Sequence, residues 1–170
     1  YEIEVGLESR RVLFRSTVLH AVKLAGTLSL PRSRQPVAAV VLITGSGSQD
    51  RDESIAGHRP FMVIADALAR RGVAVLRVDD RGVGGSTRGE SPARTIDLAE
   101  DVLAGVRLLS ERVEIDARRI GLAGHSEGGL IAPLVASRTD EGAFAGRLAG
   151  PGRPGLQNLE QDAGVMGAAE

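Results

Sequence analysis

Five consecutive residues, Gly124-His125-Ser126-Glu127-Gly128, carry the clearest chemical pattern in the chain. They match G-x-S-x-G, in which a serine on a sharp turn from a strand to a helix is exposed for nucleophilic attack on an acyl carbon. A serine in such a strained turn needs small neighbours two residues to either side, and both are glycine. The helix that begins there would direct free N–H groups toward a developing oxyanion. The pattern therefore favours acyl transfer; the alternative is a glycine-rich turn with a passive serine.

Other catalytic chemistries lack their residues. The sequence contains no cysteine, and its three histidines, His20, His58 and His125, are too scattered to indicate a zinc site. The segment DDRGVGGST offers G-x-G-x-x-T instead of the G-x-G-x-x-G of a dinucleotide-binding turn, and a phosphate-binding G-K-[S/T] is absent. We therefore expect no cofactor.

Two loops are rich in carboxylates and raise the possibility of a metal ion. Their acidic residues are Asp50, Asp52, Glu53, Asp79 and Asp80. Arginines stand beside them, so we interpret these carboxylates as members of ion pairs that hold the loops, such as Asp80 with Arg81 and Asp52 with Arg51. We predict no bound metal.

The elements that must position the serine alternate between strand and helix. Short apolar runs predict strands buried on both faces at residues 38–43, 73–78 and 119–123. The alternating segment 23–31 predicts a further strand, and 143–150 a weaker one because it contains Arg147. Apolar spacing and turn residues predict helices over 60–72, 92–110 and 130–137. This order predicts an α/β fold, a three-layer sandwich around a mostly parallel sheet.

The two ends of the chain fit this organisation less well. Residues 1–21 form an uncertain N-terminal segment, because SRRVLFRS at 9–16 follows neither the strand nor the helix period, and we expect it not to be native to the domain. The domain core spans residues 22–150. We expect residues 151–170 to be a loop and the start of a missing part. The start at Tyr1 and the small-residue tail lead us to expect a piece of a longer protein.

Composition excludes several classes of protein. The 170 residues are 42% hydrophobic, with 21 basic against 22 acidic side chains, which favours one folded domain over a disordered chain. A net charge of −1 argues against general binding to nucleic acid. No apolar stretch approaches the length of about 18 residues that predicts a membrane-spanning helix, and no signal-sequence pattern is present.

Three motifs together resemble the α/β-hydrolase superfamily, in particular bacterial esterases related to dienelactone hydrolases and serine aminopeptidases. They are TGSGSQDRDE at 44–53, DDRGVGGS at 79–86 and GHSEGG at 124–129, and each follows its own predicted strand. The resemblance implies that Ser126 is the nucleophile that forms an acyl-enzyme with a small-molecule ester. It also implies two oxyanion-hole donors: the backbone N–H of Glu127, and one from the loop after residues 38–43, with Ser46 preferred and Gly45 or Gly47 as alternatives.

The sequence departs from this family in its general base. The family's triad runs serine, acid, histidine along the chain, but no histidine follows His125. His125 adjoins Ser126 in a turn, where neighbouring side chains point apart, so we expect it not to act as the base. We predict that His58, in the loop above the site, lines the substrate site. We therefore expect an incomplete α/β-hydrolase fold that lacks the acid and histidine of its triad and is inactive by itself.

Two classes of function remain open. The first is a serine hydrolase acting on a carboxylic ester, with a serine peptidase of the same superfamily as a variant, since both use the same serine chemistry. The second is a non-catalytic fragment or binding module. An acid and a histidine further along the parent gene would distinguish the first class from the second.

Overall fold

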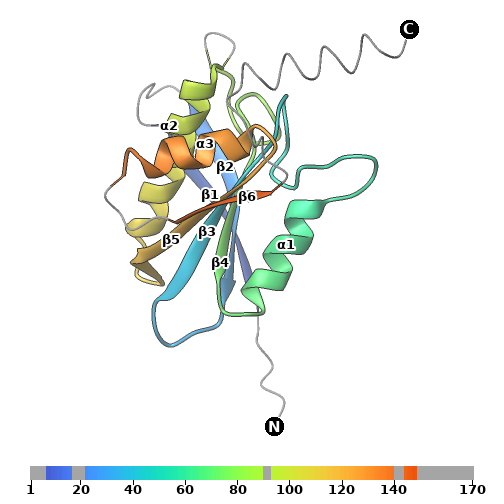
Figure 1. Ribbon diagram of the computed structural model, residues 1–170. Helices are drawn as coiled ribbons and strands as arrows, with labels where there is room; N and C mark the ends of the chain where they lie inside the picture. The colour runs from blue at the N-terminus through green and yellow to red at the C-terminus, as the bar shows by residue number, and fades with distance from the viewer. Residues whose placement is uncertain (1–6, 17–21, 90–92, 140–143, 149–170) are drawn as a thin grey trace, which may run out of the picture.

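The computed structural model describes residues 7–16, 22–89, 93–139 and 144–148, which form one sheet with helices on both faces (Figure 1). The sheet has six strands in the order β1-β2-β4-β3-β5-β6. The strands are β1 (Leu7–Arg15), β2 (Lys23–Pro31), β3 (Val37–Ile43), β4 (Ala74–Val78), β5 (Ile115–His125) and β6 (Phe144–Leu148). The helices are α1 (Pro60–Ala69), α2 (Thr95–Ser110) and α3 (Gly128–Ala136).

Four neighbouring strands of this sheet are parallel. β4, β3, β5 and β6 run in the same direction, while β2 pairs antiparallel with both β1 and β4. The loops that follow β3, β4 and β5 therefore leave the sheet at the same edge, the edge at which open α/β sheets bind their ligands. The predicted mostly parallel α/β sheet is confirmed.

The two faces of the central strand β3 pack against different helices. Val41 and Ile43 belong to the larger core cluster, which includes apolar residues of α2 and α3, whereas Val40 and Leu42 pack with Phe61 of α1. Side chains alternate between the faces of a strand, so a strand covered on both faces must be apolar throughout. α1 covers one face and α2 with α3 the other (Figure 1), which confirms the three layers.

Helix α2 buries a stripe of small and aliphatic side chains. Ala99, Leu103, Val106 and Leu109 are buried against the sheet. At its start, the Asp97 carboxylate accepts the Arg94 backbone N–H at 2.9 Å, which stabilises the first turn.

Within the described ranges, no helix is long and apolar enough to cross a bilayer.

Strand β1 corrects the interpretation of residues 9–16, for which the sequence predicted no element. Leu7–Arg15 pairs along its whole length with β2. Val12 and Phe14 are partly buried and alternate with exposed side chains, but Leu13, which is 73% exposed, breaks the apolar alternation on the outer side. Arg10 sits on the inner side, where Glu8 and Glu114 pair with it.

The remaining boundaries differ from the prediction by a few residues. β5 begins at Ile115, four residues before the predicted start, because its polar first half continues to a pairing of Ile115 with Val37 across a bulge. α3 begins at Gly128, directly after the serine turn, instead of at residue 130. The predictions for residues 1–6, for 151–170 and for His20 lie outside the described residues.

Candidate active site

Ser126 occupies the turn between β5 and α3. β5 ends at His125 and α3 begins at Gly128. Ser126 has φ of +50°, a left-handed conformation that costs a residue other than glycine about 1–3 kcal/mol. The turn is held from both sides: the Ser126 N–H donates to the carbonyl of Leu148 in β6 at 3.1 Å, and the Ser126 carbonyl accepts the Gly129 N–H at 2.9 Å. A strained serine at the carboxyl end of a parallel strand is the arrangement expected from G-x-S-x-G.

The two glycines of this motif are required by contact between backbones. A Cβ atom on Gly124 would overlap the carbonyl group of Gly128. A Cβ atom on Gly128 would lie 2.5 Å from the carbonyl oxygen of Ile43 and 2.6 Å from that of Thr44. α3 can therefore approach β5 and the end of β3 only with glycine at both positions, as the sequence predicted on steric grounds.

The loop after β3 supplies the candidate second donor of an oxyanion hole. The Gly45 N–H is already engaged, because it donates to Glu53 Oε1 at 2.7 Å. Within the described part of the chain, the N–H groups of Ser46 and Glu127 donate to no acceptor. Of the three residues considered for the second donor, Gly45 is thus occupied, while in the described part of the chain neither Ser46, the preferred one, nor Gly47 has an acceptor for its amide.

The Asp80 carboxylate accepts two hydrogen bonds from the loop after β3. One carboxylate oxygen accepts the Thr44 hydroxyl and the other the Gln49 N–H, each at 2.8 Å. Burial in a weakly solvated position raises the pKa of Asp80 to about 6, and the nearby carboxylates of Asp101 and Glu53 act in the same direction, against the two hydrogen bonds. The carboxyl group therefore titrates close to neutral pH.

Asp79, the preceding residue, anchors a different segment. Its carboxylate binds the Arg51 guanidinium at 2.6 and 2.9 Å and accepts the Gly85 N–H at 2.9 Å. Burial alone would raise the pKa of Asp79, but the hydrogen bonds from Arg51 and Gly85 outweigh it and lower that pKa. Asp79 thus fixes the loop at 50–53 to the turn after β4.

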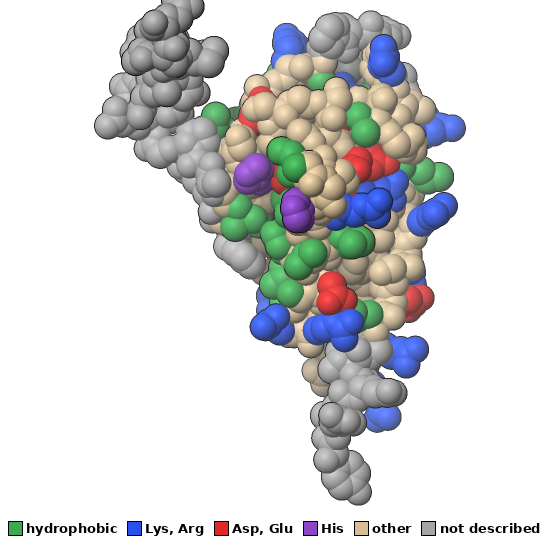
Figure 2. Space-filling model, turned by 90° about the vertical axis from the view of Figure 1, so that its right-hand side faces the viewer, with side chains coloured by type: hydrophobic (Ala, Val, Ile, Leu, Met, Phe, Trp, Pro, Cys, Tyr) green, Lys and Arg blue, Asp and Glu red, His purple; other side chains and the backbone are tan. Residues whose placement is uncertain are grey.

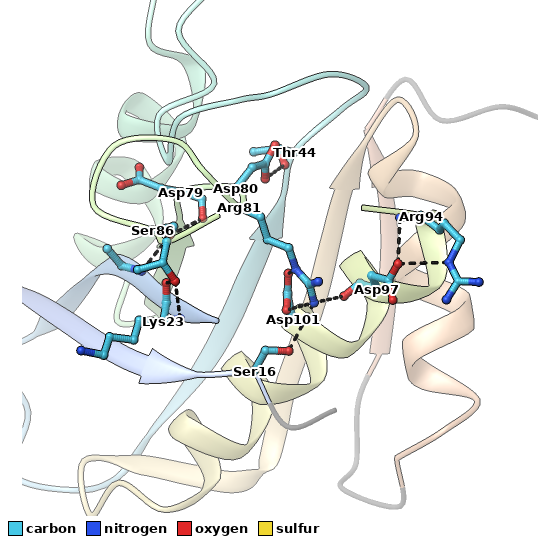
Figure 3. Close-up of polar contacts among 12 residues, drawn as sticks. Ser16, Lys23, Thr44, Asp79, Asp80, Arg81, Ser86, Arg94, Asp97 and Asp101 are labelled. Carbon is cyan, nitrogen blue, oxygen red and sulfur yellow. Dashed lines mark hydrogen bonds and ion pairs between the residues drawn. The ribbon is translucent and has the colours of Figure 1, made fainter. Parts of the chain in front are cut away.

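The side chain of Arg81, the third consecutive charged residue after β4, points toward α2 (Figure 3). Its Nη2 lies 2.7 Å from Asp101, 3.1 Å from the Asp97 carbonyl oxygen and 3.4 Å from the Ser16 hydroxyl. The side chains of Asp79, Asp80 and Arg81 therefore each tie a different segment to the end of β4.

The predicted ion-pair partners were wrong, although the interpretation of the carboxylates as structural holds for these pairs. Asp80 does not pair with Arg81, nor Asp52 with Arg51. Arg51 pairs instead with Asp79, Arg81 with Asp101, and Asp52 with Arg77. Both predicted pairs lie in turns outside the strands, and the two side chains of each pair reach different neighbours there.

A cavity of about 540 Å³ opens beside these loops. It is lined by residues of the loop after β3, of the turn after β4 and of α2, together with the residue that follows Ser126: Gly47, Ser48, Asp80, Arg88, Leu98 and Glu127. The Glu127 carboxylate accepts the Thr95 hydroxyl at 3.2 Å on this side. Ser126 and Ser46 are not among the described residues that line it, so the cavity is a candidate place for a part of the substrate beside the serine turn.

The two described histidines lie in different settings. His58 is exposed, and its backbone exchanges two hydrogen bonds with Ile55. It is not among the described residues that line the cavity, and its role in binding a substrate stays a prediction. The side chain of His125 is 43% exposed, and its Nδ1 lies 2.8 Å from Glu53 Oε1. Histidine side chains are visible at the surface on the α1 side of the molecule (Figure 2).

Sequence reasoning missed Glu53, which it treated as one of several acidic loop residues. Glu53 is 5% exposed and contacts both Gly45 and His125. Nothing in its sequence neighbourhood marks it as buried, because Asp50, Asp52 and Ser54 around it are polar too. The described residues bring together no group of three or more histidine, aspartate or glutamate side chains that could hold a metal ion.

A mostly parallel sheet between two helical layers, with a serine on a strained strand-to-helix turn, defines an α/β hydrolase. The chain belongs to the serine aminopeptidase S33 family, whose family model matches residues 35–152.

The chain is similar to one curated esterase and to two solved structures. It is 32% identical over 139 residues to the esterase EstD of Thermotoga maritima, a match that covers 82% of this chain and 33% of that protein. The esterase Pf2001 of Pyrococcus furiosus superposes with a TM-score of 0.63 at 25% identity, over 79% of this chain and 49% of that one. The α/β hydrolase GrgF of Penicillium sp. sh18 has a TM-score of 0.70 at 21% identity, over 95% and 54%. The chain thus spans a third of the curated relative and about half of these structures.

Proposed function

We propose that the protein is a serine hydrolase that cleaves a carboxylic ester of a small molecule through an acyl-enzyme on Ser126. The observation that carries the proposal is the conformation of Ser126: φ of +50° at the carboxyl end of a parallel strand, with α3 starting two residues later. Strain of this kind persists where the surrounding structure enforces it, and it clusters at active sites. The two esterase relatives support an ester as the substrate.

In the proposed reaction, Ser126 Oγ attacks the carbonyl carbon of the ester while its proton passes to a base. The negative charge moves to the carbonyl oxygen, which the N–H groups of Glu127 and Ser46 stabilise. Collapse of this intermediate expels the alcohol, which takes up a proton, and leaves the acyl group on Ser126. Water then hydrolyses the acyl-enzyme to the acid.

The base and its partner acid belong to a longer protein in this proposal. No histidine follows His125 in the sequence, and the imidazole of His125 is turned toward Glu53. The relatives are two to three times as long as the matched segment, which leaves ample chain for both residues. The 170 residues would then hold the nucleophile and the oxyanion hole without the rest of the triad.

Hydrolysis of p-nitrophenyl acetate by the full-length protein tests the proposal. We expect turnover that Ser126→Ala abolishes, and labelling of Ser126 by a fluorophosphonate. Because the family is named for aminopeptidases, an amino-acid p-nitroanilide is the second substrate; faster cleavage of the anilide would favour the peptidase. A full-length protein that hydrolyses neither, and resists the fluorophosphonate, would favour a binding module.

A further inference from the structure

Glu53 differs from Asp52 in the same loop and from Asp79 after β4. Asp52 and Asp79 pair with arginines, whereas Glu53 is 5% exposed and its Oε1 meets an amide and an imidazole. This oxygen accepts the Gly45 N–H at 2.7 Å and lies 2.8 Å from His125 Nδ1. Burial of a carboxylate is costly unless hydrogen bonds satisfy it. One buried oxygen therefore joins the loop after β3, the loop at 50–53 and the last residue of β5.

The group that Glu53 holds is in contact with the nucleophile. A Cβ atom built on Gly45 would lie 3.1 Å from Glu53 Oε1, 3.2 Å from His125 Nδ1 and 3.2 Å from Ser126 Cβ. These four residues form one packed cluster. A shift of the Gly45 peptide would therefore change the position of the next N–H, that of Ser46, relative to Ser126.

We propose that Glu53 is a positioning residue for the oxyanion hole, an inference that rests on the proposed function. By accepting the Gly45 N–H, Glu53 fixes the Thr44–Gly45 peptide, and so restricts the next peptide, which carries the Ser46 N–H that would face the substrate oxygen. By contacting His125, it ties this loop to the residue before Ser126. Glu53 contacts neither the substrate nor Ser126 Oγ in this role.

The proposed role predicts a measurable loss of rate when Glu53 is replaced. Donors in an oxyanion hole act over a narrow range of about 2.7–3.1 Å, and a displacement of about 1 Å can cost about 100-fold in rate. We therefore expect Glu53→Ala to lower kcat by about 10- to 100-fold. KM should change little, because an ester in its ground state depends less on these donors.

Glu53→Gln is the conservative variant. Its amide oxygen, in the place of Glu53 Oε1, can accept both the Gly45 N–H and a proton carried by His125 Nδ1. We expect its kcat to stay within about threefold of the wild type, because both contacts survive. Glu53→Asp keeps the charge but shortens the side chain by one methylene, and should behave like Glu53→Ala.

The experiment compares these variants in the full-length protein by three measurements: kcat and KM for p-nitrophenyl acetate, inhibition by phenylboronic acid, and hydrogen exchange of residues 44–49. The boronate forms a tetrahedral anion on a serine and so reports on the oxyanion hole. In Glu53→Ala and Glu53→Asp we expect weaker boronate inhibition in step with kcat, and faster exchange at 44–49. Glu53→Gln should restore all three.

The matched control is Glu114→Ala. Glu114 also makes two side-chain contacts, with Arg10 at 2.7 Å and Arg112 at 3.0 Å, but it precedes β5 at the opposite edge of the sheet. We expect this variant to lose stability while it keeps kcat and boronate inhibition. If Glu114→Ala loses as much activity as Glu53→Ala, general destabilisation explains the effect of Glu53→Ala, and the inference is overturned.

The remaining outcomes are also decisive. Unchanged kcat, inhibition and exchange in Glu53→Ala would overturn the inference alone, and so would a loss in Glu53→Gln as large as in Glu53→Asp. If Glu53→Ala does not fold, these last two variants carry the test. A wild-type protein without turnover or fluorophosphonate labelling would overturn the proposed function, and the inference with it.

Discussion

A methyl group on Gly45 would lie 3.2 Å from Cβ of Ser126, so the loop after β3 and the serine turn after β5 are packed directly against each other. The two segments are 81 positions apart in sequence and meet because β3 and β5 are adjacent parallel strands. Their loops leave the sheet at the same edge. The sheet topology thus forms the site before any side-chain contact is considered.

This contact predicts that Gly45→Ala damages activity more than stability. The added methyl group would crowd Glu53, His125 and Ser126 at 3.1–3.2 Å, so the neighbours must move by a few tenths of an ångström. Overpacking costs about 1–3 kcal/mol of stability, and we expect the low end here because the crowded groups lie beside a partly exposed loop. We expect kcat to fall about 10-fold or more. Ester kinetics and urea unfolding of the full-length protein measure both effects.

Gly72→Ala is the matched control for this substitution. Gly72 has φ of +86°, and no atom lies within 4 Å of the place that a methyl group would take, so alanine is strained there without being crowded. It should cost about 1 kcal/mol of stability and leave kcat unchanged. Equal activities of Gly45→Ala and Gly72→Ala would show that crowding at Gly45 has no catalytic consequence.

The backbone of Ser126 predicts an effect on stability that is separate from chemistry. Glycine adopts φ of +50° without a steric penalty, whereas alanine keeps the strain of serine. Ser126→Gly should therefore be more stable than Ser126→Ala by about 1 kcal/mol in urea unfolding, although the proposed function predicts that both variants are inactive. At Ser137, where φ is −76°, the order should reverse, because glycine there only adds freedom to the unfolded chain. A Ser126→Gly variant less stable than Ser126→Ala would contradict the strain.

Asp80 gives the pH dependence of stability. Its pKa in the folded protein, about 6, lies above its ordinary value of 3.8, so the folded state retains the proton longer than the unfolded state. The free energy of unfolding should therefore fall as pH rises from about 4 to 6, by at most about 3 kcal/mol from this group. Asp80→Asn removes the titration, so its stability relative to the wild type should improve over this interval. Urea unfolding at pH 4 and pH 7 measures the difference.

The neighbouring Asp79 should show the opposite sign. Its pKa is lowered in the folded protein, so the ionised form stabilises the fold above the ordinary pKa and this contribution is lost at lower pH. Asp79→Asn should accordingly be destabilised at pH 7, with a deficit that shrinks in acid. If the free energies of unfolding of Asp79→Asn and Asp80→Asn, each relative to the wild type, change with pH in the same direction, the different environments of these two carboxylates do not determine the pH dependence of stability.

The fold could be predicted from the sequence where both faces of an element impose the same pattern. The continuous apolar run in β3 reflects two covered faces, and the glycines at 124 and 128 reflect contact of two backbones. β1 escaped prediction because it is an edge strand: Leu13 points outward and Arg10 inward, so no period is visible. The first half of β5 escaped for a similar reason, since Asp116 and Arg118 interrupt it.

The site was predictable only in part. Ser126 and the segments around it follow from a local motif in a predicted strand-to-helix turn. The partners of Arg51, Arg81 and Glu53 do not, because each lies at least eight positions away in sequence and is selected by the direction of the side chain in the folded protein. Charge composition indicates that pairs will form without indicating which ones.

The last prediction compares the 170-residue chain with the full-length protein. Within the described residues, Ser126 Oγ has no hydrogen-bonded base, and the imidazole of its neighbour His125 contacts Glu53 instead. A serine hydroxyl without a base is a weak nucleophile. We therefore expect the 170-residue chain to react with a fluorophosphonate at least about 1000-fold more slowly than the full-length protein.

Two controls separate a missing base from a failure to fold. Circular dichroism should show a folded chain with a cooperative transition, and hydrogen exchange should show protected amides in β3 and β5. A residual reaction that Ser126→Ala removes would reflect the oxyanion donors alone, since hydrolases without their triad retain about 10³–10⁴-fold acceleration over water. Rapid labelling of the 170-residue chain would instead require a base within it. His58 is then the first residue to test, and loss of labelling in His58→Ala would locate that base in the loop before α1 and remove the need for a histidine supplied by a longer chain.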